Sequence, residues 1–132
     1  MNRTMNLDAA ALLREACPHL LVVTEQDILS SHGRDWTRFR EPAPSAVVFP
    51  GSVQQVSELV ACAADRQIAL VPSGGRTGLS GGAVAAQGEV VVSFDRMRRV
   101  LAFDAIDRTV TVEAGVVTAT VQSLAREKNL YY

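Results

Sequence analysis

The first clear pattern along the chain is an apolar block, a helical repeat and a second apolar block. Residues 46–49 are continuously apolar and are closed by Pro50-Gly51, which suits a buried strand. Ser52 is a helix-capping residue type, and Gln55 three positions later completes a capping box. The next apolar positions recur at helical spacing and predict one buried face: Val53, Val56, Leu59, Val60 and Ala63. A second apolar block at 68–71 completes a strand–helix–strand (βαβ) unit, whose crossover is expected to be right-handed if the strands are parallel.

Downstream of this unit the pattern predicts another buried strand, an antiparallel hairpin and a last helix. These elements are expected at 89–94, at 100–104 with 109–114, and from Thr118, as the cap, to about Lys128. In the second hairpin strand the valines alternate with Thr109, Thr111 and Glu113, so these three side chains are expected to face water. Helical spacing turns Val121, Leu124 and Ala125 inward, and Asn129 is expected at the C-cap.

Upstream, residues 7–16 are rich in Ala and Leu and predict a short amphipathic helix that ends before Pro18. Residues 20–23 form a short apolar strand or turn, and Thr24 is expected to cap a helical turn over 26–29. Residues 32–43 look irregular. The expected class is therefore α+β, a βαβ unit followed by a mixed or antiparallel sheet with packed helices.

Composition narrows the class without pointing to a partner. The 132 residues carry a net charge of −1 and are 48% hydrophobic, as expected for one globular domain and not for a nucleic-acid-binding or disordered chain. Cys17 and Cys62 match no metal or redox spacing, so both are expected to be reduced and buried, which favours a cytoplasmic protein. The N-terminal stretch contains charged residues and does not fit a signal peptide, and no apolar run is long enough to span a bilayer. The clustered arginines Arg96, Arg98 and Arg99 are interpreted as a solvated turn rather than a phosphate site.

The chemistry of the chain is concentrated in the run Pro72-Ser-Gly-Gly-Arg-Thr-Gly-Leu-Ser-Gly-Gly82, which follows an apolar block. Glycine lets the backbone approach a ligand closely, and successive N–H groups in such a turn can form a nest for an anion. The run lacks the Gly-Lys-Ser/Thr ending of a Walker A loop. It also lacks the spacing of the dinucleotide fingerprint. Two interpretations stay open on these grounds, a loop of tight turns and a loop that holds phosphate through N–H groups and hydroxyls.

The run and its surroundings resemble the FAD-binding domain of the FAD-linked oxidases, the vanillyl-alcohol oxidase and p-cresol methylhydroxylase (PCMH) superfamily. The resemblance covers roughly 42–132, including Val91–Met97 and Thr111–Val116. Within the superfamily it is greatest to the D-lactate, glycolate and D-2-hydroxyglutarate dehydrogenases. It implies that residues 46–132 are the first half of a PCMH-type FAD-binding domain, preceded by a helical lead-in segment at 1–45.

The resemblance also implies roles for residues of the loop. Ser73, Gly74, Gly75, Arg76, Thr77 and Gly78 would contact the FAD pyrophosphate. Leu79, Gly82 and Ala83 would shape the cavity near the flavin, and Pro72 would set the exit of the strand. Some relatives carry a flavin-linking histidine at the position of Arg76. Because arginine cannot form that bond, non-covalent FAD is expected. His19 and His32 are interpreted as isolated surface or core histidines.

The resemblance further implies that a second half of the domain and a substrate domain are missing after Tyr132. No residue of the chain is then a candidate for the acid–base chemistry of alcohol oxidation. The expected function is the FAD-binding part of a 2-hydroxy-acid dehydrogenase or oxidase. Two alternatives stay open: a non-catalytic half-domain that associates with itself or another chain, and a binder of a phosphate ligand other than flavin.

Overall fold

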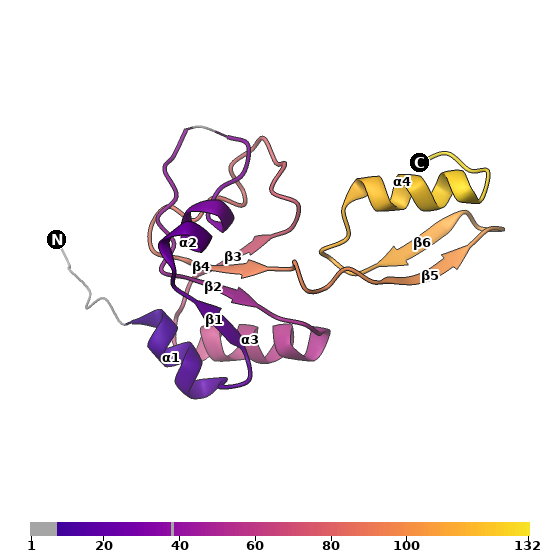
Figure 1. Cartoon of the computed structure of the whole chain (residues 1–132). Helices are drawn as coiled ribbons and strands as arrows, with labels where there is room; N and C mark the ends of the chain where they lie inside the picture. Colours follow the sequence, from indigo (N-terminus) through magenta and orange to yellow (C-terminus); the bar gives the residue numbers. More distant parts are fainter. Residues whose placement is uncertain (1–7, 38) are drawn as a thin grey trace.

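A computed structural model describes residues 8–37 and 39–132, and its centre is a four-stranded sheet (Figure 1). The strands are β1 (Leu21–Val23), β2 (Ala46–Phe49), β3 (Leu70–Ser73) and β4 (Val90–Ser93), in the spatial order β1-β2-β4-β3. β1 is antiparallel to β2, whereas β2 and β3 both run parallel to β4. The expected βαβ unit is present, but β4 lies between its two strands.

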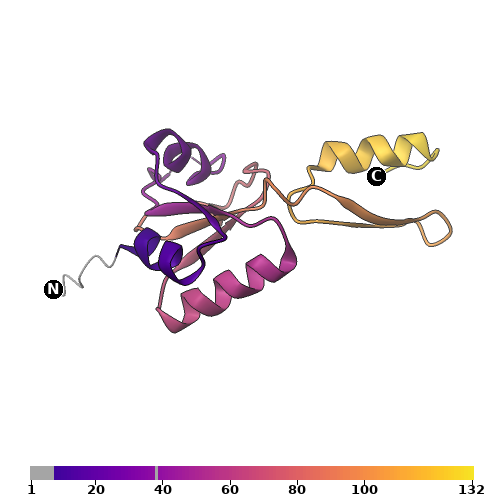
Figure 2. The ribbon, with the colours of Figure 1, turned by 60° about the horizontal axis from the view of Figure 1, so that its bottom comes forward.

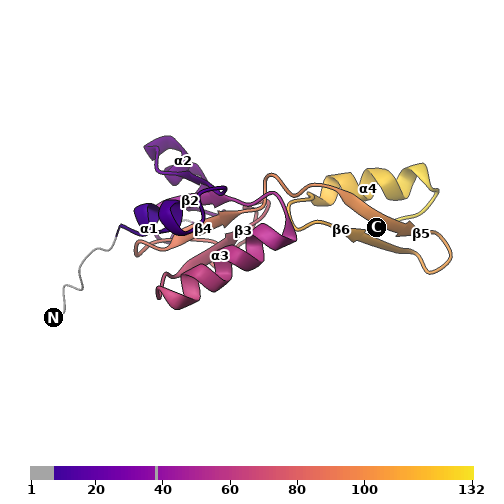
Figure 3. The ribbon, with the colours of Figure 1, turned by 90° about the horizontal axis from the view of Figure 1, so that it is seen from below.

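Helices cover both faces of this sheet, as Figures 2 and 3 show. α1 (Ala9–Ala16) and α3 (Val53–Asp65) pack on one face, where Leu13, Val48 and Leu59 are fully buried. α2 (Gln26–His32) covers the other face, together with Ala85 from the loop that precedes β4. Because β2 and β4 are covered on both sides, their continuous apolar runs match the buried strands that the sequence predicts.

The chain then leaves the sheet and forms a second, smaller unit, drawn in orange and yellow in Figure 1. β5 (Val100–Asp104) and β6 (Thr109–Val112) form the expected antiparallel hairpin, and α4 (Thr118–Glu127) lies along it. Val121 and Ala125 of α4 are buried. Leu130 is half-buried, but Tyr131 is fully exposed, so this tyrosine does not pack back on the domain.

The junction between the two units is a close backbone crossing at Gly115. The Gly115 N–H donates to the Met97 carbonyl at 2.8 Å, and the Met97 N–H donates to the Phe94 carbonyl at 2.9 Å. A Cβ added at Gly115 would lie 1.9 Å from the Phe94 carbonyl oxygen. Only glycine fits this position.

Several sequence predictions are wrong in detail. β3 begins two residues later than expected, since Gln67 adopts a positive φ and the Ile68 N–H closes the end of α3 on Ala63. On α3 the buried face is Leu59, Cys62 and Ala63, whereas Val53 and Val60 are exposed. The Ser52 cap is confirmed, although Gln55 accepts from the N–H of Gly51 rather than from that of Ser52.

The caps of the two other helices also differ from expectation. α2 extends to His32 and its N-cap is Glu25, because the Thr24 hydroxyl accepts a hydrogen bond from Arg14 instead. α4 has Val117 at its N-cap, so Thr118 is the first helical residue and makes no cap. Lys128 is the C-cap, and Asn129 follows it in the left-handed conformation with φ of 56°. The expected division of the chain at residue 45 stays a prediction.

Candidate functional site

The glycine-rich run connects β3 to β4 at the carboxyl ends of the parallel strands. In open sheets with parallel strands this is the edge where ligands bind. The loop lies beside residues 33–37 (Figure 1). There the Trp36 N–H donates to the Gly78 carbonyl at 3.1 Å, and the Ala85 N–H donates to the Gly33 carbonyl at 3.0 Å. These two bonds hold the connection at Gly78 and at Ala85, and neither involves residues 72–77.

The backbone donors of the loop are the first sign of an anion site. None of the N–H groups of residues 75–80 donates a hydrogen bond to any residue in the described part of the chain. The space beside Gly75 and Gly82 is open, because a Cβ added at either residue would meet no described atom within 4 Å. Unpaired N–H groups beside open space can receive phosphate oxygens.

Positive φ angles are less common in the loop than its glycines suggest. Only Gly81 among its glycines is left-handed, with φ of 77°, and Arg76 adopts a φ of 58° although it has a side chain. Gly74, Gly75, Gly78 and Gly82 do not use this freedom. Their advantage is the missing side chain, which lets another group come close to the backbone.

The structure places the other predicted site residues in three different environments. Ser73 is the last residue of β3 and is fully buried, and its Oγ has no hydrogen-bond partner among the described residues. Pro72 lies in the same edge strand and is exposed. The remaining members, Thr77, Leu79 and Ala83, lie along the loop, the first two exposed and the last half-buried. A buried hydroxyl without a partner directly below the loop is the second sign of a ligand site.

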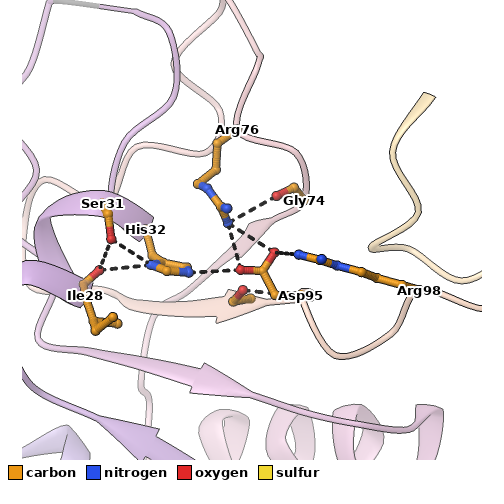
Figure 4. Close-up of polar contacts among 8 residues, drawn as sticks. Ile28, Ser31, His32, Gly74, Arg76, Asp95 and Arg98 are labelled. Carbon is orange, nitrogen blue, oxygen red and sulfur yellow. Dashed lines mark hydrogen bonds and ion pairs between the residues drawn. The ribbon is translucent and has the colours of Figure 1, made fainter. Parts of the chain in front are cut away.

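Arg76 points below the loop, toward the end of β4 (Figure 4). Its Nη1 lies 3.3 Å from Oδ2 and 3.4 Å from Oδ1 of Asp95, and 3.4 Å from the Gly74 carbonyl oxygen. Arg98 Nη2 donates to Asp95 Oδ1 at 3.1 Å, and His32 Nε2 lies 3.0 Å from Oδ2. Asp95 therefore joins three side chains that come from α2, from the glycine loop and from the turn after β4.

The charges around Asp95 favour its ionised form. Burial acts to raise the pKa of Asp95, but hydrogen bonds from His32 and Arg98 and the charge of Arg76 outweigh it, so the pKa lies below its ordinary value of 3.8. The carboxylate is thus ionised at neutral pH. With Arg76 and Arg98, the cluster of side chains around Asp95 has a net positive charge below the loop.

The sequence alone did not identify this cluster. His32 is not an isolated histidine: its side chain is 12% exposed, and it contacts Asp95 across 63 positions of the sequence. His19 pairs with Glu58 at 2.7 Å on the surface. A possible signal was the acidic residue placed directly after the buried strand β4, where its side chain reaches the same sheet edge as the loop.

The other arginines of the 96–99 turn have structural partners, as the turn interpretation requires. Arg96 Nη1 donates to the Phe49 carbonyl at 3.1 Å. Arg99 forms a two-bonded fork on Oε1 of Glu113, at 2.9 and 2.7 Å. Glu113 is therefore buried and does not face water, which corrects the expected alternation. Hydrogen bonds from the Arg99 side chain and N–H hold the pKa of Glu113 below its ordinary value.

Asp35 fixes the segment that borders the far half of the loop. Its Oδ1 accepts from the Thr37 N–H at 2.8 Å, whereas its buried Oδ2 has no hydrogen-bond partner in residues 8–37 and 39–132. The hydrogen bond from the Thr37 hydroxyl, followed by those of backbone N–H groups, lowers the pKa of Asp35 despite its burial. A carboxylate at this position repels phosphate, so an anion at this loop would lie near its first half, at Gly75.

Other kinds of site find little support in the described residues. No group of three or more His, Cys, Asp or Glu side chains in these residues could hold a metal ion. The longest helix that the structure describes, α3, has 13 residues, and no described helix could cross a membrane. The geometry fits a phosphate-bearing ligand at the loop: free N–H donors, a buried hydroxyl and a net positive charge beneath.

Comparison with known proteins agrees with this geometry. A family described as "FAD binding domain" matches residues 44–132. D-2-hydroxyglutarate dehydrogenase of Stutzerimonas stutzeri is 56% identical over 84% of this chain, and that of Xanthomonas citri is 51% identical over 91%. The chain spans about a quarter of the length of these curated relatives, 24% and 25%.

Solved structures show the same fold. Alkyldihydroxyacetonephosphate synthase superposes with a TM-score of 0.76 over 89% of this chain and 25% of its own, at 19% identity. p-Cresol methylhydroxylase with substrate bound gives 0.69 over 83% of this chain and 22% of its own, at 25% identity. The resemblance expected from the sequence is confirmed. The chain belongs to the FAD-binding domain family of the FAD-linked oxidases and has the p-cresol methylhydroxylase-type fold.

Proposed function

We propose that this chain provides the pyrophosphate-binding part of the FAD site in a flavin-dependent dehydrogenase that oxidises a D-2-hydroxy acid. The observation that carries the proposal is the series of unpaired N–H groups at 75–80, beside open space and above the buried Ser73 hydroxyl. The similarity to two bacterial D-2-hydroxyglutarate dehydrogenases favours D-2-hydroxyglutarate over D-lactate or glycolate as the substrate.

Each predicted loop residue has a role in this proposal. N–H groups of Gly75, Arg76, Thr77 and Gly78 donate to the pyrophosphate oxygens, as do the hydroxyls of Ser73 and Thr77. Gly74 and Gly82 keep the backbone accessible, and Pro72 lies in β3 directly before Ser73, the last residue of the strand. Leu79, which is 73% exposed, and Ala83 border the flavin side of the cavity. When bound, FAD supplies the hydride-accepting ring, and the residues of this chain bind and orient it.

The flavin is proposed to be non-covalent at this loop. The described part of the loop contains no histidine, and Arg76 faces Asp95 rather than the open side. The two cysteines are free and buried, which supports a cytoplasmic location for the protein.

A titration of the purified chain with FAD, followed by quenching of flavin fluorescence, tests the proposal. The matched variants are Gly75→Val, which places a side chain in the open space of the loop, and Gln87→Val, an exposed position in the same connection but outside the glycine-rich run. We expect Gly75→Val to weaken binding about ten-fold or more, the cost of losing one or two phosphate hydrogen bonds. Equal affinity of wild type and Gly75→Val would refute the loop assignment. Release of all flavin into the supernatant after acid precipitation is expected for a non-covalent site.

A second candidate, association through the β5–β6–α4 unit, rests on a separate observation. Leu101, Ile106 and Tyr131 are 55%, 92% and 100% exposed, and a cavity of about 180 Å³ lies between the hairpin and α4. α4 covers one face of the two-stranded hairpin, and most residues of β5 stay exposed, so the uncovered face offers apolar surface to a second chain. We expect light scattering to show a dimer or larger species that dissociates on Leu101→Lys. A monomer at all concentrations would exclude self-association.

A further inference from the structure

Arg76 adopts a left-handed backbone conformation that is unfavourable for a residue with a side chain, and contacts with its neighbours stabilise it there. At a φ of 58° the Cβ of a non-glycine residue is crowded by the backbone, so other interactions must stabilise Arg76 in this conformation. Figure 4 shows its side chain directed downward to Asp95, with Nη1 between the carboxylate and the Gly74 carbonyl. The same interactions therefore fix the conformation of the backbone at the tip of the loop.

Asp95 is itself held from two sides. On one side Arg98, which is 60% exposed, donates to Oδ1. On the other side lies His32, which is mostly buried and whose ring packs edge-on against Phe49 at 5.2 Å between centroids. The buried partner restricts Asp95 more than the exposed one does, because an exposed arginine side chain retains its rotamer freedom.

Both ring nitrogens of His32 face oxygen atoms. Nε2 lies 3.0 Å from Asp95 Oδ2, and Nδ1 lies 3.1 Å from the Ile28 carbonyl and 3.0 Å from Ser31 Oγ. The carboxylate is an acceptor only, so Nε2 must carry a proton to bond it. The ring orientation is thereby set by α2, and α2 is connected through Asp95 to the glycine loop.

We propose that Asp95 is a positioning residue for the glycine loop, held by His32, and that it keeps Arg76 turned below the loop so that the N–H groups at 75–80 face a phosphate. The inference rests on the proposed function for the ligand, but the conformation of the loop can be tested without one. It makes α2 a part of the cofactor site although none of its residues lies in the loop.

Positioning and simple charge predict opposite effects of an Asp95 substitution on phosphate binding. The cluster holds two arginines and one carboxylate, with His32 as the other titratable group that faces it. Asp95→Asn removes one negative charge close to the loop and would strengthen phosphate binding if charge alone mattered. If Asp95 positions the loop, the same substitution weakens binding, since Arg76 and the backbone next to it lose their anchor.

The first experiment is limited digestion with trypsin in the absence of ligand. Trypsin cleaves after arginine, so the bond between Arg76 and Thr77 reports on this anchor, and the bond after Arg108 in the exposed hairpin turn is an internal reference. We expect Asp95→Asn to raise the ratio of cleavage at Arg76 to cleavage at Arg108 about five-fold, the factor expected when a part-buried charged pair is lost. An unchanged ratio would overturn the proposal.

Further variants separate positioning from general loosening. His32→Ala is expected to raise the same ratio, whereas His32→Gln, which keeps an N–H donor for Asp95, is expected to restore it to near the wild-type value. Glu58→Gln disrupts the other histidine–carboxylate pair, on the surface at His19, and is expected to change nothing. Equal effects of His32→Ala and His32→Gln would contradict the role given to the hydrogen bond.

The second experiment is titration with FAD and with inorganic pyrophosphate. We expect Asp95→Asn to bind both about ten-fold more weakly than wild type. Equal or tighter binding by the variant would refute positioning in favour of simple charge. If the wild-type chain binds neither ligand, the proposed function fails, and the trypsin ratio still decides whether Asp95 anchors Arg76.

Discussion

Replacement of Gly115 by alanine is the most severe single-methyl change that the structure predicts. The new Cβ would lie 1.9 Å from the Phe94 carbonyl oxygen and 2.7 Å from that of Met97. Both are backbone atoms, so no side-chain rotation can relieve the contact. The crossing between the sheet and the hairpin must open instead.

The magnitude follows from what this opening disrupts. Overpacking costs about 1–3 kcal/mol. The bonds from Gly115 N–H to Met97 and from Met97 N–H to Phe94 would lengthen as well, and each contributes about 0.5–1.5 kcal/mol. We therefore expect Gly115→Ala to lower the free energy of unfolding by about 2–6 kcal/mol, a large part of the 5–15 kcal/mol typical of a domain.

Urea denaturation followed by circular dichroism measures this loss. At a slope of about 2 kcal/mol per molar urea, the midpoint falls by about 1 M or more. Gly82→Ala is the matched control, because an added Cβ there meets no described atom and its φ is not positive. We expect that variant to change stability by less than about 1 kcal/mol in either direction. Equal midpoints for Gly115→Ala and Gly82→Ala would refute the reasoning.

Two further predictions concern acid and helix capping. Because the pKa values of Asp95 and Glu113 are lowered in the folded chain, their contribution to stability is fully present above their ordinary values of 3.8 and 4.5. It is lost as the pH falls through the lower folded-state values, so acid titration of the unfolding free energy should show a decline that Glu113→Gln reduces. Ser52→Ala removes the hydroxyl that accepts from the Gln55 N–H at 3.2 Å and should cost about 1 kcal/mol in the same urea assay, with exposed Ser57→Ala as the control. If the Ser52→Ala variant is as stable as wild type, water replaces the cap and the predicted cost is wrong.

The elements that sequence analysis predicts well are those whose pattern has a local cause. Residues 46–49 and 90–92 are continuously apolar because each strand is covered on both faces. Val110 and Val112 alternate with exposed threonines because one face of the hairpin meets α4. The glycine loop is equally local, since its composition alone indicates an irregular backbone without bulky side chains; that it holds a phosphate stays a prediction. The observed ends of elements differ from the predicted ends where the conformation of a single residue sets them, as the positive φ of Gln67 does before β3.

The features that the sequence does not reveal depend on contacts between distant segments. Parallel strands carry no turn that identifies their neighbour, so nothing local places β4 between β2 and β3. His32 and Asp95 meet only because α2 and the end of β4 reach the same edge of the sheet. Glu113 continues the alternating pattern in sequence, yet it turns inward because Arg99 provides two donors for its carboxylate.

The insertion of β4 between β2 and β3 also determines when the sheet can close during synthesis. The chain makes β3 before β4, and 20 residues separate Ser73 from its partner Ser93. At a translation rate of about 5–20 residues per second, the ribosome needs roughly 1–4 s to add them. During this interval β1 can pair with β2, but β4 is not yet available. The second edge of β2 and both edges of β3 therefore have no strand to pair with in the four-stranded sheet. A ribosome that pauses before Val90 therefore holds two apolar strands with free edges, the form of the chain most prone to pair with another copy.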